Sequence, residues 1–529
     1  MNHRQQREFQ AMMDEAERQA FQATVQDATF YNIHKILEPR LKDLVKALYE
    51  QLKISNKGYL KERKIRALES ILANLYQIGV LQNKGVIFFR YPNPYYILDK
   101  KQYGKDFYSY NIMVPIIDEL ERLGYVWIAK GGYNQDSKSG RASRMWPTQK
   151  LDALFSSYQV NPGSIRHEPL ADVIHLNRGE KKKKKLVGYK DKRKVKATRG
   201  KVIRYNKLVK SSEILLDIPL GAKLSETSVG QLWRGIMANR LTPITPDPSI
   251  WYRYMTNWHG RIRPMDPIRG LGHVLREASR GRSSVPSFSF PPFITHKILC
   301  KVNVEEVHRV FNESPKFNLG GRHYGATHQG LSEELRQYLT INGEKTAEID
   351  FQGFHPRLLY HWKAKTDYRG DPYAPGGNTK IREACKIAYM IWAEHGLTTG
   401  TYPRNKKELE KVFRGTLRSI KYHLKNEAIQ LPPGMKAINI MSAFYKEHEP
   451  IIRFLHKRGN HLEMQNKDSQ IMERILKSMG KAGVLVLPIH DSVVTPKKKV
   501  DLTKQIMIES YQQVLKTQFK PVLKVSGLD

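Results

Sequence analysis

Two short strand-like segments, one ending at an aspartate and the other turning at one, constrain this chain more than any other feature. The first, 344–350, ends at Asp350, and the second, 484–494, is an apolar hairpin whose turn contains Asp491. Short apolar runs bounded by turn residues are typical of buried strands. Two carboxylates that share metal ions must lie close together, so we expect Asp350 and Asp491 side by side on neighbouring strands, although 141 residues separate them.

A basic helix is expected between the two segments. Arg382 and Lys386 are four residues apart, so they share one face of a helix, and Met390 follows one turn later. Paired carboxylates suit hard divalent cations, and basic side chains bind phosphate groups. Each feature alone has an ordinary explanation, since aspartates are common in turns and basic pairs are common on solvated helices. Their order and spacing together indicate a site for two metal ions and a triphosphate.

The composition indicates a polyanionic partner. The 529 residues include 89 Lys and Arg against 51 Asp and Glu, a net charge of +38, and nucleic acid is the usual partner of so basic a chain. No apolar run is long enough to span a bilayer, so we expect no membrane partner. The 2 cysteines give neither a disulfide framework nor zinc-ligand spacing. We expect a cytoplasmic protein of two to four domains.

Residues 28–155 are expected to form a nucleic-acid-binding domain after an N-terminal helix at 1–27. A helix at 110–123 is followed by strands at 125–129 and 142–146, which a polar, glycine-rich turn connects. A helix followed by such a hairpin resembles a winged helix-turn-helix domain, whose helix enters the major groove. The alternative is a unit that only mediates protein contacts. The candidate DNA-binding residues here and in the following segment are Lys138, Arg141, Arg144 and Lys183.

Residues 156–212 are expected to be a basic connector. Between 178 and 210 lie 16 basic residues and only 2 acidic ones. Such a run is typical of a mobile, solvated linker that also binds phosphates without sequence preference. A defined groove-binding element is an equal alternative.

Three motifs in the C-terminal half carry a family resemblance. They are Asp350-Phe351 with Arg357 seven positions after the aspartate, the helix with Arg382, Lys386 and Met390, and the His490-Asp491 turn. Through these motifs, residues 320–497 resemble the single-subunit nucleic acid polymerase superfamily. This superfamily includes family A DNA polymerases and phage-type RNA polymerases. The resemblance is greatest to small polymerase-like proteins of phages and mobile elements. The resemblance implies an α+β right-hand fold. A palm with an antiparallel sheet and inserted fingers would occupy 336–529, and a helical, thumb-like region 213–335.

The resemblance also implies a role for each matching side chain. Asp350 and Asp491, with Phe351, would hold two Mg²⁺ ions, for which Mn²⁺ could substitute, and the two aspartates would be catalytic. The residues implied at the incoming nucleotide are Arg382, Lys386, Tyr389, Met390 and His355. Those implied at the primer–template are His490, Arg322, Gln465 and Arg357.

These expectations lead to a template-directed DNA polymerase of a phage, plasmid or other mobile element, acting as a monomer on primer–template DNA and dNTPs. His355 occupies the position at which family A DNA polymerases carry a glutamate that blocks a ribose 2′-hydroxyl, and a bulky residue there favours dNTPs. Ser492 after Asp491 resembles the RNA polymerase version of the hairpin, so an RNA polymerase or primase that uses rNTPs is the first alternative. A non-catalytic replication initiator that binds DNA is the second.

Overall fold

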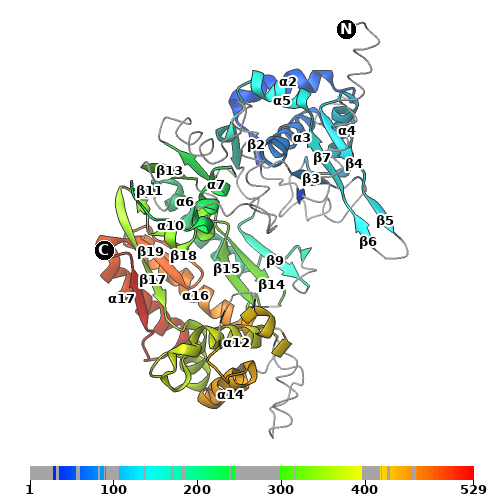
Figure 1. Cartoon of the computed structure of the whole chain (residues 1–529). Helices are drawn as coiled ribbons and strands as arrows, with labels where there is room; N and C mark the ends of the chain where they lie inside the picture. The colour runs from blue at the N-terminus through cyan, green and yellow to red at the C-terminus, as the bar shows by residue number, and fades with distance from the viewer. Residues whose placement is uncertain are drawn as a thin grey trace. The chain divides into compact units, whose positions relative to one another are not determined.

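The structure, a computed structural model, is a mixed α+β protein whose sheets are mainly antiparallel (Figure 1). The residues that it describes are 28–30, 35–54, 60–80, 84–88, 90, 107–134, 139–167, 172–179, 185–237, 240–244, 297–303, 306–314, 316–395, 417–418, 420–425, 429, 431–455 and 460–528. The chain divides into two compact units. One contains Met1–Asp172 and Leu216–Glu305, and the other contains Val173–Leu215 and Glu306–Asp529.

The first unit combines helices with a four-stranded sheet. Its main elements, with β11 at the boundary between the units, are β1 (Ala28–Phe30), β2 (Lys35–Leu37), α2 (Lys42–Gln51), α3 (Leu60–Asn74), β3 (Gly85–Phe88), α4 (Tyr110–Arg122), β4 (Val126–Ala129), β5 (Gly132–Asn134), β6 (Ser139–Arg141), β7 (Ser143–Pro147), α5 (Gln149–Ser157), β8 (Ile165–His167), β11 (Ile214–Ile218), α7 (Glu226–Met237), β12 (Leu241–Pro243) and β13 (Ile298–Val302).

The helix and hairpin expected near residues 110–146 are present in this unit. The helix is α4, and the two strands are β4 and β7, which pair antiparallel within a sheet of order β1-β3-β7-β4. Ser109 occupies the N-cap position of α4, but its side chain makes no capping hydrogen bond. Gly124, with φ of 73°, ends the helical segment, because its positive φ is a conformation that glycine adopts without steric cost.

The second unit carries the candidate site. Its main elements are β9 (Ile174–Arg178), β10 (Lys185–Leu186), α6 (Arg193–Lys210), β14 (His308–Asn312), β15 (Gly320–Tyr324), α10 (Glu333–Arg336), β16 (Leu339–Ile341), β17 (Glu344–Phe351), α11 (Phe354–Leu359), the π-helical turn η6 (Tyr360–Ala364), the short 3₁₀ turn η8 (Thr379–Ile381), α12 (Arg382–His395), α14 (Ala437–Glu447), α15 (Glu449–Leu455), α16 (Asn460–Lys481), β18 (Leu487–Ile489), β19 (Ser492–Pro496), the 3₁₀ turn η9 (Lys497–Lys499), α17 (Val500–Leu515) and β20 (Leu523–Ser526).

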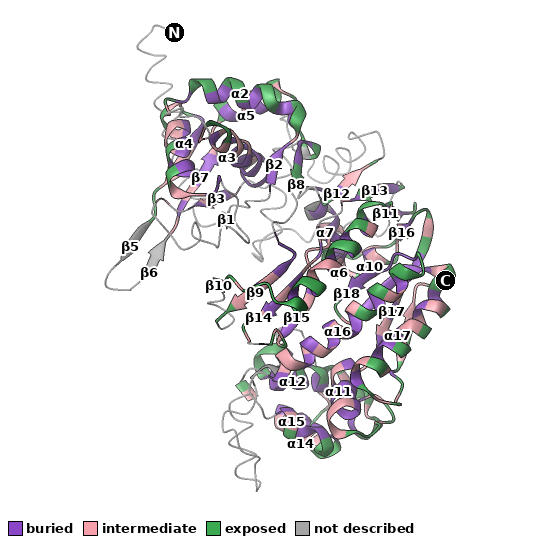
Figure 2. Ribbon diagram, turned by 180° about the vertical axis from the view of Figure 1, so that it is seen from behind, coloured by how far each residue is buried: buried purple, intermediate pink, exposed green. Residues whose placement is uncertain are grey.

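An antiparallel sheet forms the centre of this unit. β17 pairs with β16, β19 and β20, and β18 pairs with β19. α17 packs on β17 and β19, and α16 packs on α17 and on β15. Along helices such as α16 and α17, buried and exposed residues alternate, so that each helix has a buried and an exposed side (Figure 2).

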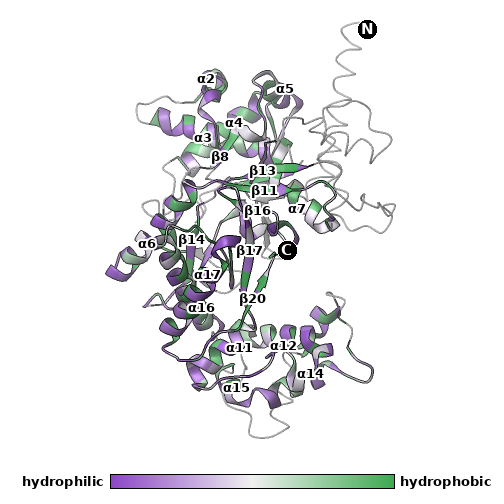
Figure 3. Cartoon of the chain, turned by 90° about the vertical axis from the view of Figure 1, so that its left-hand side faces the viewer, coloured by the Kyte–Doolittle hydropathy of each residue, from purple (hydrophilic) through white to green (hydrophobic). Residues whose placement is uncertain are grey.

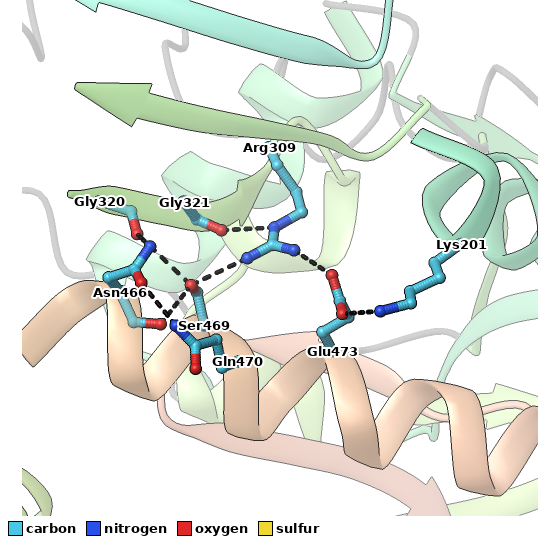
Figure 4. A network of polar contacts seen from close by, with 8 residues as sticks. All are labelled: Lys201, Arg309, Gly320, Gly321, Asn466, Ser469, Gln470 and Glu473. Atoms are coloured by element: carbon cyan, nitrogen blue, oxygen red, sulfur yellow. Dashed lines mark hydrogen bonds and ion pairs between the residues drawn. The ribbon is translucent and has the colours of Figure 1, made fainter. Parts of the chain in front are cut away.

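A buried polar network fixes α16 to the second sheet of this unit, β10-β9-β14-β15 (Figure 4). Arg309 on β14 is 2% exposed, forms an ion pair with Glu473 on α16, and donates to the Ser469 hydroxyl at 2.9 Å and to the Gly321 carbonyl at 2.7 Å. Glu473 also pairs with Lys201 of α6. A buried charge is tolerated when it is paired and fully hydrogen-bonded, so this network sets the position of α16.

The secondary structure of two middle segments, 156–212 and 213–335, differs from what the sequence led us to expect. Residues 193–210 form α6, whose apolar side is buried in the second unit, where a connector was expected. In the region expected to be a helical thumb, the described residues include the strands β11 to β15 with the helix α7. None of the helices in the described residues is long and apolar enough to cross a membrane.

Candidate active site

The two aspartates lie at adjoining ends of paired strands. Asp350 is next to last in β17 and is the register partner of Ser492, the first residue of β19. Because Ile489 of β18 also pairs with Ser492, His490 and Asp491 form a two-residue turn between β18 and β19. The backbone N–H of Phe351 donates to the Asp491 carbonyl at 3.3 Å. The structure therefore brings together the two carboxylates that the sequence spacing paired.

The carboxyl group of Asp350 lies in a negative environment. Its pKa is raised to about 7, first by burial and then by the charges of Asp491 and Glu348, while Lys386 and Lys524 act in the opposite direction. Glu348 occupies the same face of β17 two residues earlier, and Arg336 and Ser492 hold it by hydrogen bonds. A divalent cation would relieve the repulsion between these acidic groups.

The donor set fits metal ions that are shared with a substrate. In the described part of the chain no group of three or more His, Cys, Asp or Glu residues could hold a metal ion. Asp350 and Asp491 supply oxygen ligands, which Mg²⁺ prefers, and Mg²⁺ usually takes its remaining ligands from water and substrate phosphates. Phe351 has its ring buried against Phe354, with ring centroids 4.7 Å apart, so only its backbone oxygen could serve as a ligand.

The basic residues of α12 differ in their present partners. Arg382 donates to Asp371 at 2.6 Å and to Glu383 at 2.5 Å, and its guanidinium lies 5.8 Å from the centre of the buried Tyr373 ring. Lys386 is exposed and makes no ion pair with a described residue, yet it is close enough to lower the pKa of Asp350. Lys386 is thus the cation of α12 that is available to an anionic ligand near the aspartates.

The two residues at the middle of α12 face different surroundings. Met390 is 54% exposed, whereas Tyr389 is 1% exposed and its hydroxyl lies 3.6 Å from the sulfur of Met464. The Tyr389 ring also packs against Tyr373 and Phe444. In this structure Tyr389 is a core residue, so Met390 alone of the two can contact a ligand.

Arg322, Asp468 and His355 form a cluster beside the aspartates. Arg322 on β15 forms an ion pair with Asp468 at 2.5 Å, and its guanidinium lies 3.0 Å from Nε2 of His355. The Asp468 side chain is 1% exposed. The ring of His490 lies 5.6 Å from that of Tyr324, and the pKa of His490 is lowered by partial desolvation and by the Arg322 charge.

Asp468 was not among the residues selected from the sequence. It lies on α16 between the buried residues Met464, Ile471 and Met472, that is, on the apolar face of an amphipathic helix. An acidic residue at such a position needs a cationic partner, and this pattern could have identified it. The identity of its partner, Arg322, could not have been predicted from the residues of this helix, because Arg322 lies 146 residues away in the sequence.

Of the two remaining residues expected at a primer–template, Arg357 is bound to the protein's own backbone. Arg357 is buried and donates to the backbone carbonyls of Gln352, Tyr368 and Gly370. Its guanidinium therefore holds the loop that leads to Asp371. Gln465 lies half-buried on α16.

The DNA-binding candidates of the N-terminal region are only partly described. Arg144 is a half-buried residue of β7, Arg141 ends β6, and Lys138 and Lys183 lie outside the described residues. The last turns of α4 carry Asp118, Glu119 and Glu121. Arg90 pairs with Asp118 at 2.7 Å and lies 3.9 Å from Glu121, and Arg122 pairs with Glu119 at 2.8 Å, so these carboxylates have cationic partners.

Comparisons with known proteins return little similarity. No protein-family model matches the chain, and no curated protein sequence matches it. Among solved structures it is similar to the POL domain of Pol1 from M. smegmatis in complex with DNA primer-template and dNTP, with 14% sequence identity and a TM-score of 0.25. The match covers 53% of this chain and 55% of that chain, so it spans little more than half of that structure's length.

Proposed function

We propose that this protein is a template-directed DNA polymerase that transfers nucleotides from dNTPs to a primer 3′-hydroxyl. The observation that carries the proposal is the pair Asp350 and Asp491 at adjoining ends of β17 and the β18–β19 turn, with Lys386 of α12 close to Asp350. Two carboxylates beside an available lysine suit phosphoryl transfer, in which most of the catalytic work is positioning and charge stabilisation.

In this mechanism Asp350 and Asp491 would hold two Mg²⁺ ions. Bound there, such ions would supply charge stabilisation for the attacking 3′-oxygen and for the leaving pyrophosphate. Lys386 binds the triphosphate and offsets the charge that develops on it. Arg382 joins it after exchanging Asp371 for a phosphate oxygen, since both groups accept a charge-assisted hydrogen bond.

His355 is proposed to select the sugar. Arg322 lies 3.0 Å from its Nε2, and the ring stacks on Phe354 with centroids 5.7 Å apart, so its orientation is constrained from two sides. A fixed, bulky ring excludes a 2′-hydroxyl by contact and favours dNTPs over rNTPs. His355→Gly should therefore raise rNTP incorporation relative to dNTP incorporation, and an unchanged preference would remove His355 from this role.

The test is extension of a labelled primer on a DNA template with Mg²⁺, offering dNTPs and rNTPs separately. Asp491→Asn should abolish extension, while Asp501→Asn, which changes an exposed carboxylate on α17 with a 99% exposed side chain, should leave it unchanged. Incorporation of rNTPs alone, especially without a primer, would favour the RNA polymerase or primase. DNA binding without any incorporation would favour the replication initiator.

A further inference from the structure

The exposed side of α6 carries basic residues that the proposed active site does not use. Arg193, Lys196, Arg204 and Lys207 are all exposed and, at 100° per residue, lie on one face of the helix; together they are called the α6 stripe. Gly200 lies on the same face, at the middle of the stripe. In Figure 3 the exposed part of α6 has mainly the hydrophilic colour.

Three other basic residues of α6 form ion pairs: Arg199 with Asp191, Lys201 with Glu473 and Lys210 with Glu306. Lys194 donates to the Lys316 carbonyl at 3.1 Å. The four stripe residues make no ion pair with any described residue, although the charge of Lys196, after the hydrogen bond from Arg199, also lowers the pKa of Asp191. The cations on the outer face of the helix are therefore available to an anionic ligand.

This arrangement is unfavourable for the helix alone. The first turn of α6 contains no acidic residue and begins with Arg193 and Lys194, so positive charges lie at the positive end of the helix dipole. Like charges three or four residues apart on a helix also repel by about 0.2–0.5 kcal/mol for each pair. Gly200 costs roughly a further 1 kcal/mol relative to alanine. Local rules broken together in this way are typical of a functional surface.

The opposite side of α6 is fixed to the part of the unit that carries the aspartates. The Tyr205 hydroxyl donates to the carbonyl of Val486, which directly precedes β18, at 3.0 Å. The Asn206 amide donates to the Val307 carbonyl at 2.9 Å and accepts from the Val307 N–H at 3.1 Å. An anion bound to the stripe would therefore be held at a constant position relative to the β18–β19 turn.

We infer that the α6 stripe is a docking surface for the phosphate backbone of a nucleic acid. Because no stripe side chain forms an ion pair with a described residue, each can bind a phosphate, and Gly200 lets the phosphate backbone approach the helix closely. A membrane surface fits less well, because an interfacial helix inserts its apolar face into the lipid, whereas the apolar face of α6 is buried in the protein. The inference extends the proposed function but depends only on binding.

The experiment measures binding of a fluorescein-labelled DNA duplex by anisotropy at several salt concentrations, with EDTA and without dNTPs. A quadruple variant in which Gln replaces all four stripe residues should reduce the slope of log K against log salt by about 3 to 4, or about 0.9 for each lost phosphate contact. Its substitutions are Arg193→Gln, Lys196→Gln, Arg204→Gln and Lys207→Gln. The matched control replaces the exposed lysines Lys498, Lys499, Lys516 and Lys520 by Gln, which removes equal charge elsewhere, and should change the slope by less than about 1.

A second variant tests the close approach of the DNA backbone to the helix without changing the charge of the stripe. A Cβ atom at position 200 would meet only Nη1 of the flexible Arg204 side chain, at 3.6 Å, and position 200 lies on the outer side of the helix, so Gly200→Leu should fold and raise the thermal stability of the unit. The bulk of the leucine side chain should nevertheless weaken DNA binding at least several-fold.

Equal slopes for the stripe variant and its control would overturn the inference, as would unchanged affinity in Gly200→Leu. Loss of binding to phosphatidylserine vesicles but not to DNA would assign the stripe to membranes. Because metal and dNTPs are absent, none of these results depends on polymerase activity.

Discussion

Asp350→Asn should stabilise the protein in the absence of divalent metal while abolishing nucleotide incorporation. In the folded protein the Asp350 pKa is about 7, against an ordinary value of 3.8, because of burial and the nearby charges of Asp491 and Glu348. Between these two pH values the unfolded chain has released this proton and the folded chain has kept it. The free energy of unfolding therefore falls as the pH rises from about 4 to 7, and the loss is complete above pH 7.

The magnitude follows from the difference between the two pKa values. About three units at 1.36 kcal/mol each give roughly 4 kcal/mol as an upper limit. The side chain keeps part of its contact with water, and solvent screening reduces the effect to about 1–2 kcal/mol. Asparagine has nearly the same shape and no charge, so it should recover this amount at pH 8. At about 2–4 °C for each kcal/mol, the unfolding midpoint should rise by about 2–8 °C.

The assay is thermal unfolding of the wild type, Asp350→Asn and Asp501→Asn in EDTA at pH 5 and pH 8. The stabilisation by Asp350→Asn should be larger at pH 8 than at pH 5, because the wild-type carboxyl is mostly protonated at pH 5. Mg²⁺ should stabilise the wild type and have little effect on Asp350→Asn. Equal or lower stability of Asp350→Asn at pH 8 would refute the electrostatic account of this site, and the exposed Asp501→Asn control should show no gain.

Three further substitutions test other parts of the site. Arg357→Ala should lower the free energy of unfolding by about 2–4 kcal/mol in a urea titration, since it leaves three backbone carbonyls without their donor, and Arg357→Lys should recover part of the loss. Asp468→Asn should cost about 3 kcal/mol in the same titration, because Arg322 would keep its charge without a partner. Lys386→Ala should lower kcat/KM for dNTPs about 10–100-fold in primer extension with DNA affinity unchanged, whereas exposed Lys380→Ala on η8 should have no effect.

The strands that carry the aspartates could be predicted because strand formation follows from local patterns, whereas the pairing of these strands was expected from the chemistry that two carboxylates share at a metal site. Alternating burial along β17 and a two-residue turn between β18 and β19 are both visible in the residue types. The ion pairs around the site could not be predicted in this way. Asp371 for Arg382 and Asp468 for Arg322 depend on the loop path and on helix packing, which the residue order alone does not encode.

In the basic segment 178–210, the many charged residues make the helical spacing of the few apolar residues hard to recognise. Val195, Val202, Tyr205 and Val209 recur at helical spacing and are buried in the structure. Seen as composition, the same residues are a minority among lysines and arginines, and a solvated connector was the expectation. Hydrophobic periodicity was the better guide, because a few buried side chains at the right spacing suffice to fix a helix to a core.

The pairing of cations around the aspartates has a consequence for substrate binding. Arg322, Arg336 and Arg382 each have a carboxylate partner in this structure, whereas Lys386 has none among the described residues. A triphosphate can bind Lys386 directly, but it must displace Asp371 to bind Arg382, and part of the binding energy is then offset by the lost ion pair. Replacing Lys386 should therefore weaken binding of the nucleotide, while replacing Arg382 should act mainly on the rate, once the exchange with Asp371 occurs in the closed complex.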